Sequence, residues 1–181
     1  SNDQGPKSEG APLEALVALH PGRCRALVCD VTRADERGAL LARAADALGG
    51  LDGLVCSAGV VVHQAPGAIT EEALREQLEV NLVAPLRLLE LAMAGLPPGG
   101  GAVVVGSTLG QRPITTSAVY SAAKAGIVAA MQALALAGAA RGVRMNAVLP
   151  GVVDTDMVRA PRRSPPDPPP AGAARAASIA T

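Results

Sequence analysis

Apolar runs and helical patterns alternate along most of this chain. Runs that favour strands lie near residues 25–29, 52–56, 102–106 and 143–149, and helical patterns cover 11–19, 34–48, 70–94 and 117–140. An alternation of this kind is typical of βαβ units, in which successive strands are parallel. The sequence therefore predicts an α/β protein with three layers, a parallel sheet with helices on both faces.

Tyr120 is the only aromatic residue in the 181-residue chain, which has no Phe and no Trp. Lys124 follows four positions later within a helical pattern, so the two side chains share one helical face. A nearby ammonium favours the phenolate, and we therefore predict that the pKa of Tyr120 falls from about 10 toward neutrality. Such a tyrosine can act as a general acid/base on an alcohol or carbonyl oxygen. The alternative is a core tyrosine beside a solvated lysine.

Two polar residues elsewhere in the pattern extend this hypothesis. Ser107 follows the apolar run Gly101–Gly106, and α/β proteins place reacting groups at the C-terminal ends of buried parallel strands. Asn81 lies inside the helical pattern 70–94, where Asn is locally unfavourable. Pro85 has no N–H, so the carbonyl of Asn81 loses its helical partner and is free to hold a water.

Together, these four residues resemble the catalytic tetrad of the short-chain dehydrogenase/reductase family. Three segments extend the resemblance over roughly residues 11–158. They are Leu54–Gly59 (LVCSAG), similar to the family's strand-four N-N-A-G signature; Cys29–Thr32 (CDVT), similar to the acidic turn that touches adenine; and Val143–Met157 (VRMNAVLPGVVDTDM), similar to the strand-six segment with its P-G-x-x-x-T turn.

The resemblance implies a Rossmann-like sheet and an oxidoreductase that uses NAD or NADP to interconvert a small-molecule alcohol and a carbonyl. It implies that Tyr120 exchanges the proton while Lys124 lowers its pKa and binds the ribose. Ser107 would then hold the substrate oxygen, and Asn81 would anchor a relay water. The implied cofactor-binding residues are Asp30, Val31, Ala58, Gly59, Tyr120, Lys124, Pro150, Gly151, Val153 and Thr155.

The sequence departs from the family pattern at the pyrophosphate site. The family's T-G-x-x-x-G-x-G turn is absent, because Gly5, Gly10 and Gly22 have neither its spacing nor a strand before them. The predicted strands correspond to the family's third to sixth in the order 3-2-1-4-5-6, and the first, second and seventh are missing. Two missing strands would leave a gap of about 14 Å between 25–29 and 52–56, unless these two strands pair directly.

These departures favour a piece of a longer reading frame. Without a glycine turn at a helix N-terminus, we expect the 181 residues to bind NAD(P) at roughly millimolar concentration or more weakly. The alternative to an enzyme is a catalytically inactive or truncated relative with a structural, oligomer-forming role.

Composition limits the partners. The 16 basic and 16 acidic residues are scattered along the chain, which argues against nucleic acid. No apolar run approaches the roughly 18 residues that span a bilayer, and no signal peptide is apparent, so we expect a cytoplasmic protein without a membrane partner. His20 and His63 are isolated and the 3 cysteines lack paired spacing, which predicts reduced thiols and no metal site.

The helical patterns 70–94 and 117–140 are rich in Ala, Leu and Gly on more than one face. They predict a homodimer or homotetramer formed through these two helices, and the alternative is a helix pair buried within one domain. Residues 1–10 are polar and aperiodic, and 159–181 are rich in Pro and Ala. Both ends are therefore expected to be disordered around one partial domain, 11–158.

Overall fold

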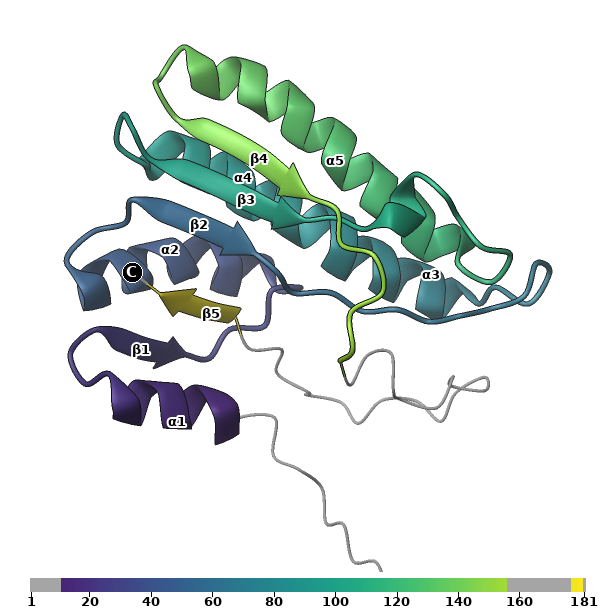
Figure 1. Cartoon of the computed structure of the whole chain (residues 1–181), viewed down its shortest axis with the longest axis horizontal. Coiled ribbons are helices and arrows are strands. Elements are labelled where there is room, and N and C mark those ends of the chain that lie inside the picture. Colours follow the sequence, from purple (N-terminus) through teal and green to yellow (C-terminus); the bar gives the residue numbers. More distant parts are fainter. Residues whose placement is uncertain (1–10, 156–176, 181) are drawn as a thin grey trace, which may run out of the picture.

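A computed structural model describes residues 11–155 and 177–180 (Figure 1). The α-helices are α1 (Ala11–Leu19), α2 (Ala34–Leu48), α3 (Glu71–Leu78), α4 (Ala84–Gly95) and α5 (Ala118–Ala139). The strands are β1 (Cys24–Leu27), β2 (Gly53–Cys56), β3 (Gly101–Val105), β4 (Arg144–Val148) and β5 (Ala177–Ala180). A π-helix, η1 (Glu79–Val83), joins α3 to α4, and a 3-10 helix, η2 (Thr108–Gly110), follows β3.

Strands β2, β3 and β4 form a parallel sheet in that order, which confirms the α/β Rossmann-like fold expected from the sequence. In its register, Leu54 lies opposite Ala102, and Ala102 lies opposite Met145. Ala102 and Met145 are buried with residues of α4 and α5 in one core cluster. The apolar alternation of each strand therefore directs one face of the sheet onto these helices.

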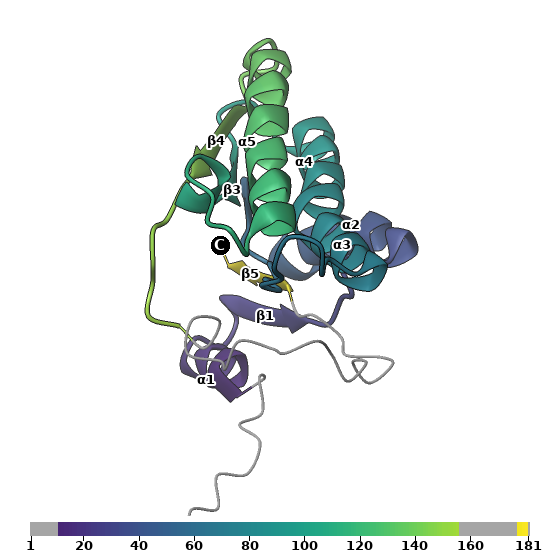
Figure 2. The ribbon, with the colours of Figure 1, turned by 90° about the vertical axis from the view of Figure 1, so that its right-hand side faces the viewer.

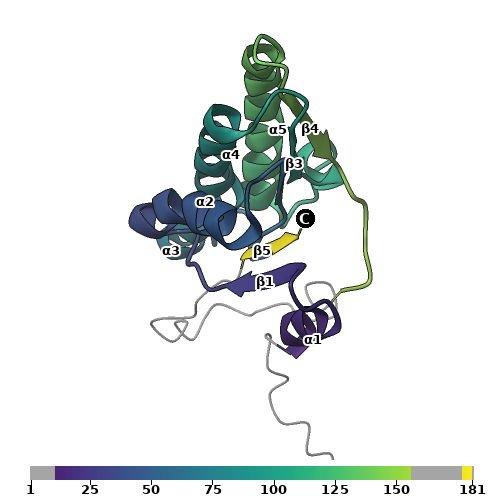
Figure 3. The same cartoon turned by 90° about the vertical axis from the view of Figure 1, so that its left-hand side faces the viewer.

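The other face of this sheet is open among the described residues. Val55 and Val148 are 59% and 53% exposed, and Figure 2 shows α4 and α5 together on one side of β3 and β4. Helices on two sides occur at β1, which α1 and α2 flank (Figures 2 and 3). Helices thus lie on both sides of the strands, as the sequence predicted, while the described residues leave this face of β2, β3 and β4 uncovered.

Strand β1 does not join the parallel sheet, and it does not pair with β2. It pairs antiparallel with β5, with Cys24 opposite Ala180 and Leu27 opposite Ala177. Figures 1 and 3 show β5 on the side of β1 that faces the parallel sheet. The backbone groups on that edge of β1 thereby gain hydrogen-bond partners that water would otherwise supply.

This pairing differs from two expectations. We expected either an empty gap beside 25–29 or direct pairing with 52–56, and β5 lies beside β1 instead. We also expected 159–181 to be disordered, and Ala177–Ala180 forms a strand. Residues 1–10, 156–176 and 181 lie outside the described residues.

The expected single helix over 70–94 is wrong in its middle, where the π-helix Glu79–Val83 separates α3 from α4. The cause lies in the sequence, because Pro85 has no N–H to give to the carbonyl of Asn81 four residues earlier. A wider turn accommodates this break, and the Ala84 N–H bonds to the Glu79 carbonyl five residues before it. The predicted N-cap is confirmed, since the Thr70 side chain accepts a hydrogen bond from the Ala73 N–H.

We expected no segment long and apolar enough to span a membrane, and helix α5 shows that this expectation was wrong. Its 22 residues pass that test by length and composition alone. Its buried residues include Lys124, Ile127 and Met131, and it packs against α4, β3 and β4. Leu136 on the same helix is 81% exposed. The placement of α5 is therefore that of a core helix with one apolar side left uncovered.

Candidate active site

Ser107 and Tyr120 are brought together by the packing of η2 on α5. Ser107 lies two residues after β3, and its Oγ accepts a hydrogen bond from the Leu109 N–H at 3.1 Å, which starts the 3-10 turn. This turn touches α5 closely, since a Cβ on Gly110 would lie 3.0 Å from the Ala125 nitrogen. The side chain of Ser107, only 8% exposed, thereby comes within hydrogen-bonding reach of Tyr120.

The predicted fall in the pKa of Tyr120 is wrong. Burial raises the pKa of this phenol above its usual value, because a low-dielectric surrounding disfavours the phenolate. The hydrogen bond with Ser107 lowers the pKa, but its effect is smaller than that of burial. Tyr120 is therefore a protonated phenol at neutral pH.

Lys124 is buried rather than solvated, with 4% of its surface exposed. Its Nζ lies over the Tyr120 ring, 5.7 Å from the centroid, and donates a hydrogen bond to the Val105 carbonyl at 2.7 Å. Burial lowers the pKa of Lys124 from 10.5 to about 8. The ammonium thus faces the ring and the end of β3. Because the pKa of Lys124 lies below that of Tyr120, the lysine is already neutral at the pH where the phenol titrates, and it cannot stabilise the phenolate there.

Asn81 ties the π-helix to the loop after β2. Its Nδ2 donates to the carbonyls of Val60 (2.8 Å) and Gln77 (2.9 Å), and its Oδ1 accepts from the Val60 N–H at 3.1 Å. Gly59 lies directly beside this contact, where a Cβ would meet Asn81 Oδ1 at 3.1 Å and Lys124 Nζ at 3.6 Å. Asn81, Gly59 and Lys124 are therefore neighbours. The role of the Asn81 carbonyl as a water ligand stays a prediction.

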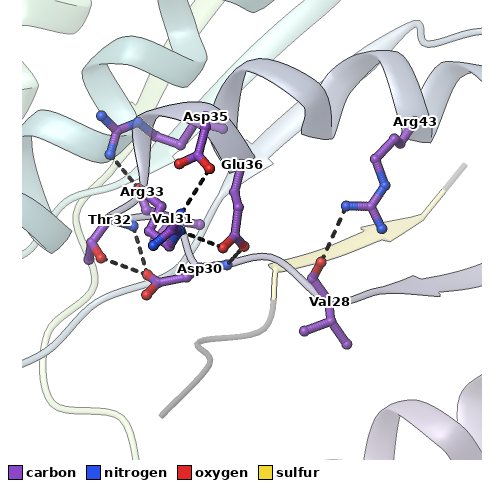
Figure 4. A network of polar contacts seen from close by, with 9 residues as sticks. Val28, Asp30, Val31, Thr32, Arg33, Asp35, Glu36 and Arg43 are labelled. Carbon is purple, nitrogen blue, oxygen red and sulfur yellow. Dashed lines mark hydrogen bonds and ion pairs between the residues drawn. The ribbon is translucent and has the colours of Figure 1, made fainter. Parts of the chain in front are cut away.

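The turn that follows β1 is held by a polar network (Figure 4). Asp30 Oδ1 accepts hydrogen bonds from the Thr32 N–H at 2.9 Å and the Thr32 hydroxyl at 2.7 Å. The Asp30 N–H donates to Glu36 Oε2 at 2.6 Å, and Arg33 pairs with Glu36 and with Asp35. These contacts orient the Asp30 carboxylate without any ligand.

The remaining predicted cofactor residues divide into buried and open positions. Val31 is 1% exposed in the core, which leaves its backbone rather than its side chain for contact with a ligand. Pro150 lies beside η2, because its carbonyl accepts from the Thr108 N–H at 3.0 Å. The other residues of that turn are exposed, namely Gly151, Val153 and Thr155.

Sequence reasoning missed two buried polar side chains around Asn81. Gln77 is 0% exposed, and its Oε1 accepts from the Val62 N–H at 3.0 Å, while its Nε2 is buried without a partner. Arg37 of α2 is 7% exposed and forms an ion pair with Glu79 of the π-helix. Their spacing could have indicated them, because residues three or four apart share one helical face. Gln77 precedes Asn81 by four residues, and Arg37 precedes the buried Leu40 by three.

The fold and the site together identify the class of protein, and comparison with known proteins identifies the family. A parallel α/β sheet with a serine at a strand end and a tyrosine–lysine pair on the adjoining helix defines a Rossmann-like dehydrogenase domain. Residues 2–167 match the family model described as Enoyl-(Acyl carrier protein) reductase. The chain belongs to the short-chain dehydrogenase/reductase family.

Individual relatives agree with this assignment. The chain is 38% identical over 159 residues to cis-4-hydroxycyclohexanecarboxylate dehydrogenase of Sinomonas cyclohexanicum, a match that covers 85% of this chain and 64% of the relative. The crystal structure of a dehydrogenase/reductase from Sinorhizobium meliloti 1021 has a TM-score of 0.78 at 31% identity, covering 84% of this chain and 62% of that one. A short chain dehydrogenase from Burkholderia cenocepacia, solved in complex with NADP, has a TM-score of 0.69 at 33% identity, covering 71% and 53%.

The chain spans only part of its relatives. It covers 47%, 64% and 64% of the length of three curated relatives that it matches. The glycine-rich pyrophosphate turn is absent from its 181 residues. Contact of the predicted residues with the adenosine and nicotinamide ends of a dinucleotide stays a prediction, and these 181 residues offer no glycine turn that would fit its pyrophosphate.

Proposed function

We propose that this chain carries the acid/base half of an NAD(P)-dependent oxidoreductase that interconverts an alcohol and a carbonyl. The observation that carries the proposal is the single phenol of Tyr120, which lies beside the buried hydroxyl of Ser107 and under the Lys124 ammonium. A bound nicotinamide would supply or accept the hydride, and the residues of this chain handle the proton.

The pKa of Tyr120 favours one direction of this chemistry. A phenol whose pKa is raised stays protonated at neutral pH and can give its proton to a carbonyl oxygen as that oxygen gains negative charge. Ser107 Oγ accepts from the Leu109 N–H, and its hydroxyl proton, which stabilises the Tyr120 phenolate when no substrate is bound, can be donated to the same substrate oxygen instead. We therefore infer that carbonyl reduction, rather than alcohol oxidation, is the favoured direction near neutral pH.

Three further residues support a dinucleotide at its two ends. Lys124 and Gly59 lie together at the nicotinamide end, where a lysine donor can reach a ribose hydroxyl and a glycine allows close approach. Asp30 presents an oriented carboxylate that can accept from an adenine amino group. Solved relatives hold NADP, and we propose NAD or NADP for this chain.

A second candidate function is structural. The chain would then be an inactive relative that keeps the site by descent and acts in an oligomer. Leu91 of α4 and Leu136 of α5 are 40% and 81% exposed, which favours a homodimer or homotetramer through these helices for either candidate.

The test uses this chain extended upstream with the strand, glycine turn and helix of a similar dehydrogenase. Tyr120→Phe should remove carbonyl reduction while dinucleotide affinity stays within about two-fold, because only the proton donor is lost. Ser107→Ala should also lose turnover, and Thr108→Ala, at the exposed neighbouring position, serves as its control. Turnover that survives in Tyr120→Phe would show that another group is the acid, and an extended chain without any turnover would favour the structural candidate.

A further inference from the structure

Arg37 is the one arginine of α2 whose side chain is buried among the described residues of that helix. It shares the apolar face of α2 with Leu40 and Ala44, which are 1% exposed. Its Nη1 donates one hydrogen bond to the Val31 carbonyl at 2.6 Å and another to Glu79 Oε1 at 2.9 Å. Both protons of a single nitrogen therefore join two segments that lie 48 residues apart in sequence.

The two segments are the two parts of the candidate site. Val31 belongs to the turn oriented by the Asp30–Thr32 hydrogen bonds. Glu79 opens the π-helix, and its backbone carbonyl accepts the five-residue bond from Ala84. Asn81 lies two residues further along that helix and holds Val60 by two hydrogen bonds. Arg37 therefore connects the Asp30–Thr32 turn to the π-helix, and Asn81 connects the π-helix to the loop at Gly59 and Val60, which lies beside Lys124.

Burial distinguishes the Arg37–Glu79 ion pair from the exposed ion pairs of this chain. The Arg37 side chain is 8% exposed and that of Glu79 is 35% exposed. A buried guanidinium needs a charged partner, because an unpaired charge in a low-dielectric surrounding is strongly destabilising. Charge-assisted hydrogen bonds are also stronger and more directional than neutral ones. By contrast, the pair Arg87–Glu90 on α4 has the same chemistry at 2.8 Å with side chains 63% and 45% exposed, and exposed pairs contribute little.

We propose that Arg37 is a positioning residue, which holds the π-helical turn of Asn81 in place through Glu79 and couples it to the Asp30–Thr32 turn through Val31. The coupling to a ligand rests on the proposed function. Adenosine bound at the Asp30 turn would restrain Val31, and this restraint would reach Asn81 and the loop at Gly59. The adenosine and nicotinamide ends would then bind with positive cooperativity.

Hydrogen exchange of backbone amides tests the positioning role without any cofactor. Arg37→Met keeps an unbranched side chain on the buried face, and Arg87→Met is the matched control. In Arg37→Met, the amides of Val60 and Val62 should exchange at least about ten-fold faster relative to the amides of β3. The Val60 acceptor, Asn81 Oδ1, sits on the loosened turn. The Val62 acceptor, Gln77 Oε1, lies on α3 two residues before that turn begins. Arg87→Met should leave that ratio unchanged.

A merely structural role gives a different pattern. If Arg37 only contributes to global stability, Arg37→Met accelerates exchange in β3 and in the Val60 loop by the same factor, and the proposal is overturned. Should Arg37→Met fail to fold, Glu79→Gln keeps the length and the acceptor oxygen while it removes the charge. The same selective acceleration at Val60 is expected from that variant, and uniform acceleration would overturn the proposal there too.

Adenosine monophosphate is the probe for the coupling. Its addition should shift the side-chain amide resonances of Asn81 in the unsubstituted chain and in Arg87→Met, but not in Arg37→Met. Binding that moves the Asp30–Thr32 resonances and leaves Asn81 unaffected would overturn the coupling. If adenosine monophosphate moves no resonance, the cofactor assignment fails, and the exchange experiment still decides the role of Arg37.

Discussion

Replacement of Lys124 by methionine has a consequence that depends on pH and that can be worked out from the structure. Lys124 is 4% exposed and its pKa is lowered from 10.5 to about 8. The fold therefore favours the neutral amine, and the unfolded chain binds more protons than the folded chain between these two values. The free energy of unfolding that Lys124 contributes must rise with pH across this window.

The size of the effect follows from the shift. A difference between 10.5 and about 8 corresponds to about 3 kcal/mol, which is the cost of burying the ammonium at low pH. About 2 kcal/mol of it is relieved between about pH 7 and about pH 9.5. Methionine has a similar length and no charge, so Lys124→Met does not carry this cost. It loses only the hydrogen bond to the Val105 carbonyl, worth about 1 kcal/mol.

The buried thiols change the free energy of unfolding with pH in the opposite direction to Lys124, so the assay must separate the two contributions. Burial raises the pKa of Cys56 to about 12 and also raises that of Cys29, so the unfolded chain loses these protons first and stability falls as pH rises past about 9. The two contributions therefore have opposite signs in the unsubstituted chain. Urea unfolding of both proteins under reducing conditions removes the thiol contribution from the difference between them.

We expect Lys124→Met to be more stable than the unsubstituted chain at pH 7, and the difference to shrink by about 2 kcal/mol by about pH 9.5. A difference that stays constant over this range would show that Lys124 is not desolvated as its burial requires. A difference that grows with pH would reverse the sign of the linkage and refute the reasoning.

Three further predictions concern single positions. Ultraviolet titration of the only tyrosine should place the pKa of Tyr120 above 10, and Ser107→Ala should raise it further; a midpoint below 10 would contradict the dominance of burial. Asn81→Leu should cost about 2–4 kcal/mol in urea unfolding, because both backbone groups of Val60 lose their partners, and a loss under about 1 kcal/mol would contradict this. Gly38→Ala should stabilise α2 by about 1 kcal/mol in thermal unfolding, since a Cβ there meets nothing within 4 Å; destabilisation would show a hidden contact.

The parallel strands and the helices were predictable because their periodicities are local. Strands β2, β3 and β4 begin and end within about two residues of the apolar runs, since alternation along a strand reports burial directly. The pairing of β1 with β5 was not predictable. It depends on backbone groups more than 150 residues apart and on a segment without apolar periodicity.

The proximity of Tyr120 and Lys124 was predictable from the sequence, and the pKa shifts of the candidate site were not. The four-residue spacing placed Tyr120 and Lys124 on one helical face, as found. The direction of the Tyr120 pKa shift depends on burial beneath η2 and on where the ammonium points, neither of which spacing contains. Arg37 was visible as a charge on an apolar helical face, but its partner Glu79 lies 42 residues away and only the fold brings them together.

The central claim is that these 181 residues hold the acid/base half of a dinucleotide enzyme and lack the part that receives the pyrophosphate. Titration calorimetry with NADP, on this chain and on the same chain extended by an upstream strand, glycine turn and helix, tests that claim most directly. We predict a Kd at roughly millimolar or weaker for the chain itself, because its sequence contains no glycine turn that would bring a helix N-terminus to the phosphates. The extended chain should bind at micromolar concentration. Micromolar binding by the 181 residues alone, or no gain on extension, would contradict the account.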